Sequence, residues 1–150
     1  MPTATTSIPN PDKTLGDPNS LISSLLAAIP HAVIGLRDRR IIFANPAVKT
    51  VFGWGPEELI GQTTRILYRS DRDYEAVARR FYPILANQKT YQAEFPCRRK
   101  DQHDITCMLS AARVGNRLRD RTIIVTYEDI TRRKEDREAL RESEQLLKMI

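Results

Sequence analysis

The residue types that most often carry enzyme chemistry are sparse in this chain and are not arranged as in known active sites. Neither of the two histidines, His31 and His103, has partners at the spacing of a metal site. The chain also has no glycine-rich phosphate loop, nucleophile elbow or His-Glu-x-x-His motif. Glu57 and Glu58 are adjacent carboxylates, which we assign to the surface of a helix. The sequence therefore predicts neither an active site nor a metal site, and we do not expect this chain to be an enzyme by itself.

Two cysteines are the remaining candidates for chemistry. Cys97 and Cys107 flank a predicted β-hairpin whose turn lies near residues 101–103. A three-residue loop would place the two cysteines opposite each other, whereas a two-residue loop would place Cys97 opposite Thr106. They could form a redox pair, but we favour two small buried hydrophobic side chains on a sheet. Two cysteines make no disulfide framework, so the expected compartment is a reducing cytosol.

Length and composition are typical of one compact domain with tails. The 150 residues are 41% hydrophobic and carry a net charge of +5, and no stretch approaches the roughly 18 apolar residues of a membrane span. Basic residues alternate with acidic ones, as in RRKEDREALRESE, which favours a solvated surface of mixed charge over a nucleic-acid or lipid interface. Residues 1–18 hold four prolines and no apolar periodicity, so we expect a disordered leader there.

The elements that would position any site begin with a short helix and a hairpin. Leu21, Leu25 and Ala28 predict one face of an amphipathic helix that ends at Pro30 and is capped by Asn19 or Ser20. Two apolar runs around Asp38-Arg39 then predict a hairpin, although its turn lacks the favoured glycine.

Short helices and three strands complete the predicted domain. Asn45 is the predicted cap of a helix that starts at Pro46. Ser70, three residues before Asp73, predicts the start of a longer helix, which Pro83 should kink or shorten. Alternating apolar residues then predict strands over 90–99, 104–114 and 121–129. Strands grouped at both ends with helices between them favour an α+β fold with an antiparallel sheet.

Three segments resemble the PAS domain family in the order in which that family has them. FANPAVKTVFGWGPEELIGQ, which begins at Phe43, is similar to the family's Asn-x-Ala…Phe-Gly-Tyr-Ser-x-Glu-Glu-Leu-Ile-Gly segment. CRRKDQHDI resembles the Arg-Arg-Lys-Asp-Gly hairpin, with Gln102 in the glycine position, and EDITRRKEDREAL resembles the Asp-Ile-Thr ending and its outgoing helix. The resemblance implies a five-stranded antiparallel sheet with short helices on one face, flanked by an N-terminal helix and a C-terminal signalling helix. It places the PAS domain at residues 19–131 and the signalling helix at 132–150.

The resemblance implies that the last strand passes a signal directly to this helix. Asp129, Ile130 and Thr131 form the connection, and Thr131 is expected to cap the helix. The helix is polar and would be marginal alone. Its apolar residues fall near a seven-residue seam that Ser143 interrupts, which favours pairing with a second copy of the chain. The seam residues are Leu140, Leu147 and Ile150. RESEQLLKMI also resembles the opening helix of a further PAS module, so a downstream domain is expected in the same polypeptide.

The cofactors that PAS domains carry can be compared with these residues. A covalent flavin adduct needs a cysteine before the long helix, and GQTTRILYRSD has none. The best-known haem sensors need a histidine on that helix, and SDRDYEAVARRFYPILA has none. Trp54 could stack on a noncovalent flavin, but we favour a packing role. No cofactor is therefore predicted, and an unknown small ligand would lie between sheet and helices. The candidate pocket residues, which could equally form a core, are Leu36, Phe43, Leu67, Val77, Phe81, Leu109 and Val125.

The leading hypothesis is a cytoplasmic PAS sensory and dimerisation module. It would act in signal transduction, for example in a two-component system, by regulating an output enzyme such as a histidine kinase or a diguanylate cyclase. One alternative is a ligand-free structural module that only mediates dimerisation. The less favoured alternative is a nucleic-acid-binding domain that uses Arg98, Arg99, Lys100 and the arginines of 117–121.

Overall fold

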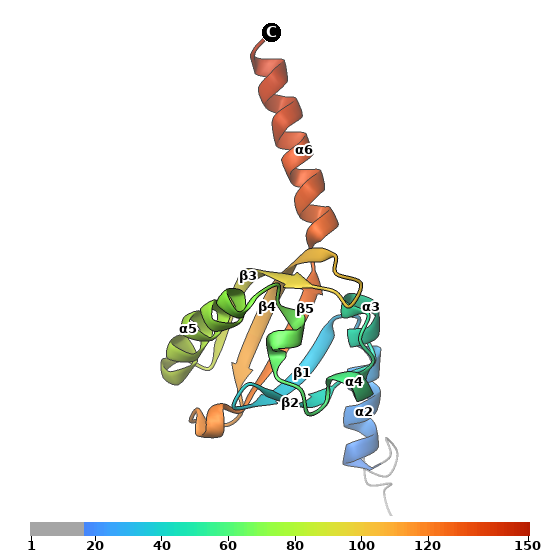
Figure 1. Ribbon diagram of the computed structural model, residues 1–150, viewed down its shortest axis with the longest axis vertical. Helices are drawn as coiled ribbons and strands as arrows, with labels where there is room; N and C mark the ends of the chain where they lie inside the picture. The colour runs from blue at the N-terminus through green and yellow to red at the C-terminus, as the bar shows by residue number, and fades with distance from the viewer. Residues whose placement is uncertain (1–16) are drawn as a thin grey trace, which may run out of the picture.

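The computed structural model describes residues 17–150, which form an α+β fold (Figure 1). Its centre is one antiparallel sheet of five strands in the order β2-β1-β5-β4-β3. This architecture agrees with the expectation from the sequence. The strands are β1 (Ala32–Arg37), β2 (Arg40–Ala44), β3 (Thr90–Arg98), β4 (Asp104–Arg113) and β5 (Ile123–Asp129).

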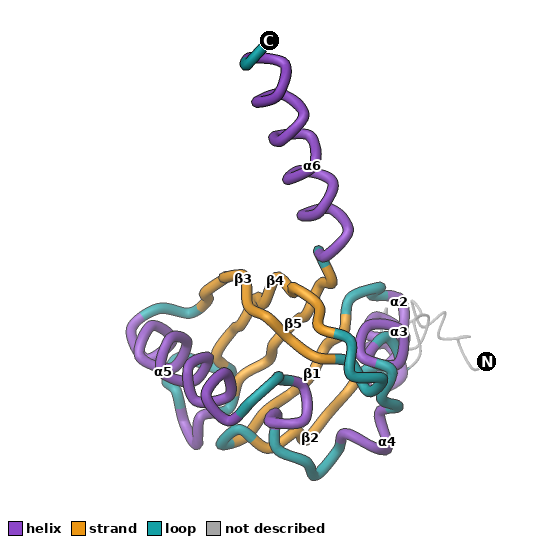
Figure 2. Tube along the Cα trace, turned by 45° about the horizontal axis from the view of Figure 1, so that its top comes forward, coloured by secondary structure: helices purple, strands orange, loops and turns teal. Residues whose placement is uncertain are grey.

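Short helices cover one face of this sheet, and the C-terminal helix stands away from it (Figures 1 and 2). Helices α3, α4, η1 and α5 lie on the covered face, and the hydrophobic core fills the space between them and the sheet. No helix within residues 17–150 is long and apolar enough to span a membrane. The helices are α2 (Pro18–Ala28), α3 (Val48–Phe52), α4 (Pro56–Leu59), α5 (Asp71–Asn87) and α6 (Thr131–Lys148), with 3₁₀ turns η1 (Thr64–Leu67) and η2 (Arg119–Arg121).

The β1–β2 hairpin has the two-residue turn expected from the sequence. Arg37 pairs with Arg40, so Asp38 and Arg39 form the turn. Both take left-handed conformations, with φ of 48° and 68°. A type I′ turn demands this conformation at both positions, and its twist matches that of the strands. The turn therefore forms without glycine and fixes the place of the Arg39 side chain.

The β3–β4 hairpin turns one residue earlier than expected. Arg99 N donates to the carbonyl of His103, and Gln102 takes the left-handed conformation with φ of 74°. A three-residue turn closes in this way, with its last residue left-handed. The register consequently places Cys97 opposite Ile105. The three-residue length considered from the sequence was therefore right, but its placement at 101–103 was wrong, and the two cysteines are diagonal rather than direct neighbours.

Helix α2 begins two residues before the predicted boundary. Asp17, rather than Asn19 or Ser20, is its cap, because the Asp17 carboxylate accepts from Ser20 N at 2.8 Å. Pro18 takes the first helical position, which needs no amide donor. Of the predicted disordered leader, residues 1–16 lie outside the described part of the chain.

Asn45 holds the end of α2 against the sheet. Its side chain is fully buried, its Oδ1 accepts from Val33 N at 2.8 Å, and its Nδ2 donates to the carbonyls of Leu26 and His31. The expectation that Asn45 caps the next helix was wrong, because α3 starts later, with Ala47 at the capping position and no side-chain cap. Asn45 instead satisfies buried backbone groups that would otherwise lack partners.

Helix α5 covers part of the sheet and contributes Val77, Phe81 and Leu85 to the core. Ser70 caps it by accepting from Asp73 N at 3.1 Å, as the sequence predicted. The helix continues four residues beyond Pro83, so the expected shortening was wrong. Pro83 lies on the exposed side of the helix, where a carbonyl that loses its amide partner can be hydrated.

Candidate functional site: an internal cavity and the output junction

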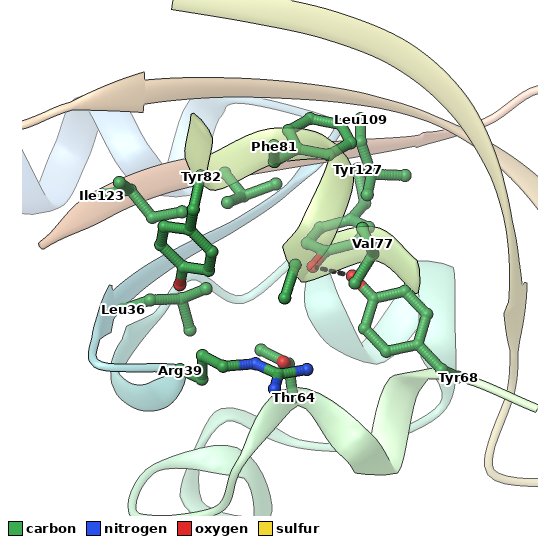
Figure 3. A pocket seen from close by; sticks show the side chains of 12 residues that line it. Leu36, Arg39, Thr64, Tyr68, Val77, Phe81, Tyr82, Leu109, Ile123 and Tyr127 are labelled. Carbon is green, nitrogen blue, oxygen red and sulfur yellow. Dashed lines mark hydrogen bonds between the residues drawn. The ribbon is translucent and has the colours of Figure 1, made fainter. Parts of the chain in front are cut away.

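A small cavity lies between the sheet and α5 (Figure 3). Its volume is about 30 Å³, and a single water needs roughly 10–15 Å³ on this measure. The cavity therefore has room for about two waters or a very small molecule. Five of the seven residues that the sequence suggested for a pocket line it, namely Leu36, Val77, Phe81, Leu109 and Val125. Leu67 is fully buried in the core but does not line the cavity.

Phe43 lies outside the pocket, which corrects the remaining suggestion. It is 37% exposed, and so is its neighbour Ile42 at 44%. Gly35 pairs with Phe43 and Leu36 pairs with Ile41, so Ile42 is an extra, bulged residue in β2 that shifts the register. Two successive residues of β2 consequently face outward, which simple alternation does not allow. Phe43 covers Gly35, where an added Cβ would lie 3.3 Å from the Phe43 Cβ.

A pair of buried tyrosines forms one polar part of the cavity wall. The hydroxyls of Tyr68 and Tyr127 are 3.0 Å apart, and each side chain is almost completely buried. Burial raises the pKa of both phenols well above the usual range, so both stay neutral. The two hydroxyls satisfy each other.

A second polar part consists of Arg39 and Tyr82. The Arg39 guanidinium lies over the Tyr74 ring, 3.3 Å from its centroid, donates to the Tyr74 carbonyl, and bonds Glu75 at 3.1 Å. The Tyr82 hydroxyl is buried and has no hydrogen-bond partner among residues 17–150. Burial raises the pKa of Tyr82 to about 12. Both residues line the cavity, and in Figure 3 the Tyr82 hydroxyl lies beside Leu36 while the Arg39 guanidinium extends toward Thr64.

The candidate pocket residues chosen from the sequence did not include these polar residues. Apolar periodicity identifies the core face of a helix or strand, and Tyr82 follows Phe81 directly, off the apolar stripe of α5. Arg39 was assigned only to a turn. The presence of Tyr68 and Tyr127 could have been inferred, because large residues with polar tips commonly occur inside when paired.

The second candidate site is the junction between β5 and α6. Asp129 Oδ1 accepts from Thr131 N at 3.0 Å and from the Thr131 hydroxyl at 2.6 Å. The same hydroxyl accepts from Thr106 N of β4 at 2.9 Å, and Ile130 N donates to the Thr106 carbonyl. Thr131 is the first residue of α6 and not its cap, which corrects the expectation. Its hydroxyl instead attaches the helix to a neighbouring strand.

The β3–β4 hairpin also contacts helices α3 and α4. Arg99 Nη1 donates to the carbonyls of Thr50 and Val51 at the end of α3, and Lys100 Nζ bonds Glu58 of α4 at 2.8 Å. The last carbonyls of a helix have no hydrogen-bond partners within the helix, and a cation there also interacts favourably with the negative end of the helix dipole. The hairpin therefore connects α3 and α4 to the strand that holds Thr131.

Both terminal helices present apolar side chains that nothing in the described chain covers. No residue of α2 or α6 is buried within residues 17–150. The expected seam residues Leu140 and Leu147 of α6 and Ile150 just beyond it are exposed, and Leu146 and Met149 are exposed beside them. Exposed apolar rows on a helix favour pairing with another surface.

The cysteines and histidines form no reactive centre in the described chain. Cys97 and Cys107 are both free and fully buried. Burial, with a smaller contribution from Cys107, raises the pKa of Cys97 well above its ordinary value, which disfavours the reactive thiolate. Over residues 17–150 there is no group of three or more histidines, cysteines or carboxylates that could hold a metal ion.

Comparison with known proteins agrees with this architecture. The sensor protein TdiS of Thauera aromatica is 23% identical over 134 residues, which cover 89% of this chain and 24% of that protein. This chain thus spans about a quarter of the relative it matches.

Two solved PAS domains have the same fold. One, in complex with ethanol, comes from a LuxR-family transcriptional regulator of Burkholderia thailandensis; it is 20% identical, with a TM-score of 0.67, over 71% of this chain and 95% of that chain. The other, from Colwellia psychrerythraea, is 19% identical, with a TM-score of 0.68, over 77% and 99% of the respective chains. The sequence model of the PAS domain family matches residues 30–132, more than half of the chain. The chain therefore belongs to the PAS domain family.

Proposed function

We propose that this chain is a sensory and dimerisation module that controls an output domain through α6. The output domain, or a further PAS module before it, would lie in the same polypeptide, and the output enzyme would be a histidine kinase or a diguanylate cyclase. The similarity to a sensor protein supports this reading. A cytoplasmic location belongs to the same proposal, and the two free thiols support it.

The observation that carries the proposal is the attachment of α6. The helix makes no buried contacts of its own in the described chain, so its start is positioned by Asp129, Thr131 and Thr106. A shift of β4 relative to β5 would change these bonds and so reorient the helix. Single hydrogen bonds contribute about 0.5–1.5 kcal/mol, and the signalling states of such modules differ by a few kcal/mol. A junction of this size can therefore bias the equilibrium without unfolding the domain.

The test is to change the junction in the intact receptor. Asp129→Ala and Thr131→Ala should leave the domain folded and should shift the output activity or its response to a signal. Glu135→Ala, on the same helix but outside the junction, is the matched control. Wild-type output and response in both junction variants would show that the connection is only a linker.

Dimerisation through the terminal helices can be measured on this chain alone. We expect sedimentation to show a dimer that the double variant Leu140→Glu/Leu147→Glu converts to a monomer, because the two substitutions place charges within the exposed seam. Glu138→Gln and Glu142→Lys change the charge of the same helix outside the seam and serve as controls. A dimer that survives the double variant would assign the interface to another surface.

The small cavity favours a second candidate, a ligand-free dimerisation module. At about 30 Å³ the cavity holds neither a flavin nor a haem without rearrangement. We accordingly expect the purified chain to be colourless, with no haem Soret band and no flavin absorption. The Burkholderia domain is in complex with ethanol, which supports considering a ligand of only a few atoms for this chain as well. Mass spectrometry of gently released ligand separates a sensor of small molecules from a purely structural module.

We do not propose nucleic-acid binding for the hairpin arginines and lysine. Arg98, Arg99 and Lys100 are each within 4 Å of a carboxylate, so little free charge remains for phosphate. A binding constant for DNA or RNA that falls steeply with salt would contradict this view.

A further inference from the structure

One buried polar atom of the cavity lacks the partner that buried polar atoms normally have. The Tyr82 hydroxyl has no hydrogen-bond partner within residues 17–150, although the Tyr68 and Tyr127 hydroxyls satisfy each other. An unsatisfied buried group costs on the order of the full desolvation penalty, and native proteins keep few of them. A ligand or an ordered water that accepts from Tyr82 would remove this penalty.

The surroundings of the Tyr82 hydroxyl are rich in donors and positive charge. Arg39 lines the same cavity, and the Arg121 guanidinium lies 4.9 Å from the centre of the Tyr82 ring. Burial is the largest influence on the Tyr82 pKa and raises it, the charges of Arg39 and Arg121 lower it, and the charge of Asp38 raises it. Burial still prevails, so Tyr82 keeps its proton and can donate it.

The carboxylate that balances Arg39 is loosely held. Glu75 bonds the guanidinium at 3.1 Å, but its side chain is 57% exposed, whereas that of Arg39 is 14% exposed. An exposed ion pair is weak because water competes for both charges. A second anion inside the cavity could therefore share or replace Glu75 as the counterion of Arg39.

The remaining walls are apolar and close together. Val77, Phe81, Leu109 and Val125 surround the polar end, and the volume of about 30 Å³ admits only a compact molecule. A buried anion must be paired and hydrogen-bonded to be stable, and Arg39 with Tyr82 meets both needs. We propose that the cavity binds a short monocarboxylate whose carboxylate group is held by Arg39 and Tyr82. This inference rests on the proposed sensory function and names the ligand class for the same site.

Acetate and acetamide test this proposal on the full chain, because they have the same shape and differ in charge. Each is titrated at constant ionic strength while amide and methyl resonances of cavity residues are followed by NMR. We expect acetate to shift the resonances of Val77, Leu109 and Val125 with saturation, and acetamide to bind at least roughly tenfold more weakly.

Two variants and one control locate the contact. Tyr82→Phe and Arg39→Gln should each weaken acetate binding by roughly tenfold or more. Tyr91→Phe removes a phenol hydroxyl that bonds Arg80 outside the cavity and should leave acetate binding unchanged. If Arg39→Gln does not fold, Tyr82→Phe alone decides, since it keeps the ring and its packing.

Three outcomes would overturn the ligand class. They are equal binding of acetate and acetamide, unchanged acetate binding in Tyr82→Phe, and no saturable shift up to about 50 mM, far above the Kd that a well-held ligand of about four heavy atoms can reach. The junction variants in the intact receptor test the sensory function separately. If the junction variants change the output of the receptor but this chain does not bind acetate, the proposed ligand class is wrong and the proposed sensory function stands.

Discussion

The backbone amide of Thr106 donates to the hydroxyl of Thr131 across 2.9 Å, and this bond joins β4 to the first residue of the outgoing helix. The Thr131 hydroxyl in turn donates to Asp129. One hydroxyl thus accepts from β4 and donates to the end of β5. In the proposed mechanism, a displacement between the two strands would be transmitted to the start of α6 at this point.

The first prediction removes this hydroxyl while keeping the shape of the side chain. Thr131→Val should lower the free energy of unfolding by about 1–2 kcal/mol, because the Thr106 amide loses its acceptor and Asp129 loses a donor. Chemical denaturation measures the loss, and hydrogen exchange of the Thr106 amide should become faster. Thr131→Ser keeps the hydroxyl and should stay close to wild type. Equal exchange rates in the valine variant and wild type would show that the bond does not hold the helix.

The second prediction concerns the buried amide of Asn45. Asn45→Ala leaves Val33 N and the carbonyls of Leu26 and His31 without their partner. We expect a loss of about 2–4 kcal/mol of unfolding free energy and faster exchange in the last turn of α2. Asn116→Ala changes an exposed loop residue and should stay within about 0.5 kcal/mol. A small effect at Asn45 would mean that α2 is held by other contacts.

Asn45 also illustrates how far the sequence could predict this structure. The succession of strands along the chain, the hairpin at Asp38 and the start of a helix directly after the last strand follow from apolar alternation and from a family resemblance, so these were predicted. Asn45 precedes a proline and looks like a helix cap, but its partners Leu26 and Val33 lie in segments that only the folded chain brings together. Local patterns contain no information about such distant partners.

The cavity residues show the same limit. Core positions such as Leu109 and Val125 repeat at regular spacing and could be predicted. Phe43 was expected on the same face from the sequence, but the extra residue Ile42 in its own strand places its side chain on the outward face. Arg39 and Tyr82 lie off the apolar pattern, and their meeting depends on how the β1–β2 turn packs against α5. Bulges and packing between turns depend on tertiary contacts, which periodicity does not describe.

The third prediction compares the loss of stability caused by truncating a side chain on the covered face of the sheet with that caused by truncating one on the open face. Leu109 is 1% exposed and lines the cavity, so Leu109→Ala should destabilise the domain by about 2–5 kcal/mol. Ile124 lies on the open face and is 45% exposed, so Ile124→Ala should cost less than about 1 kcal/mol in the isolated chain. Urea unfolding followed by Trp54 fluorescence gives both values. A large loss at Ile124 would show that the open face is covered in solution.

The fourth prediction concerns the two thiols. Cys97 and Cys107 are fully buried, and burial raises the pKa of Cys97, so thiol reagents should label the native chain at least roughly a thousandfold more slowly than the urea-unfolded chain. Because the cysteines are diagonal across β3 and β4, the oxidant diamide should not join them in the native state. Rapid formation of the disulfide in the native protein would identify a redox pair.

The last prediction is a loss of stability at alkaline pH. Burial raises the pKa of Tyr82 to about 12, from an ordinary value of 10.0, and also raises the pKa of Tyr68 and Tyr127 well above that ordinary value. Below pH 10 these phenols hold their protons in both the folded and the unfolded chain, and their contribution does not change with pH. Above pH 10 the unfolded phenols lose protons that the folded ones keep, so each tyrosine lowers stability by up to about 1.4 kcal/mol per pH unit.

Tyr82 should stop contributing once the pH passes about 12, where the folded phenol also ionises. Cys97 acts in the same direction from about pH 9, its ordinary pKa, because burial raises the pKa of the folded thiol. Urea unfolding between pH 8 and pH 11, read from Trp54 fluorescence, should show a shallow decline above about pH 9 and a steeper one above about pH 10. Tyr82→Phe removes one of these phenols, so its unfolding free energy should fall less steeply above pH 10 than that of the wild type. Identical slopes for the variant and the wild type would mean that the Tyr82 hydroxyl is solvated in the folded chain, and a solvated hydroxyl would not need the ligand acceptor proposed for it.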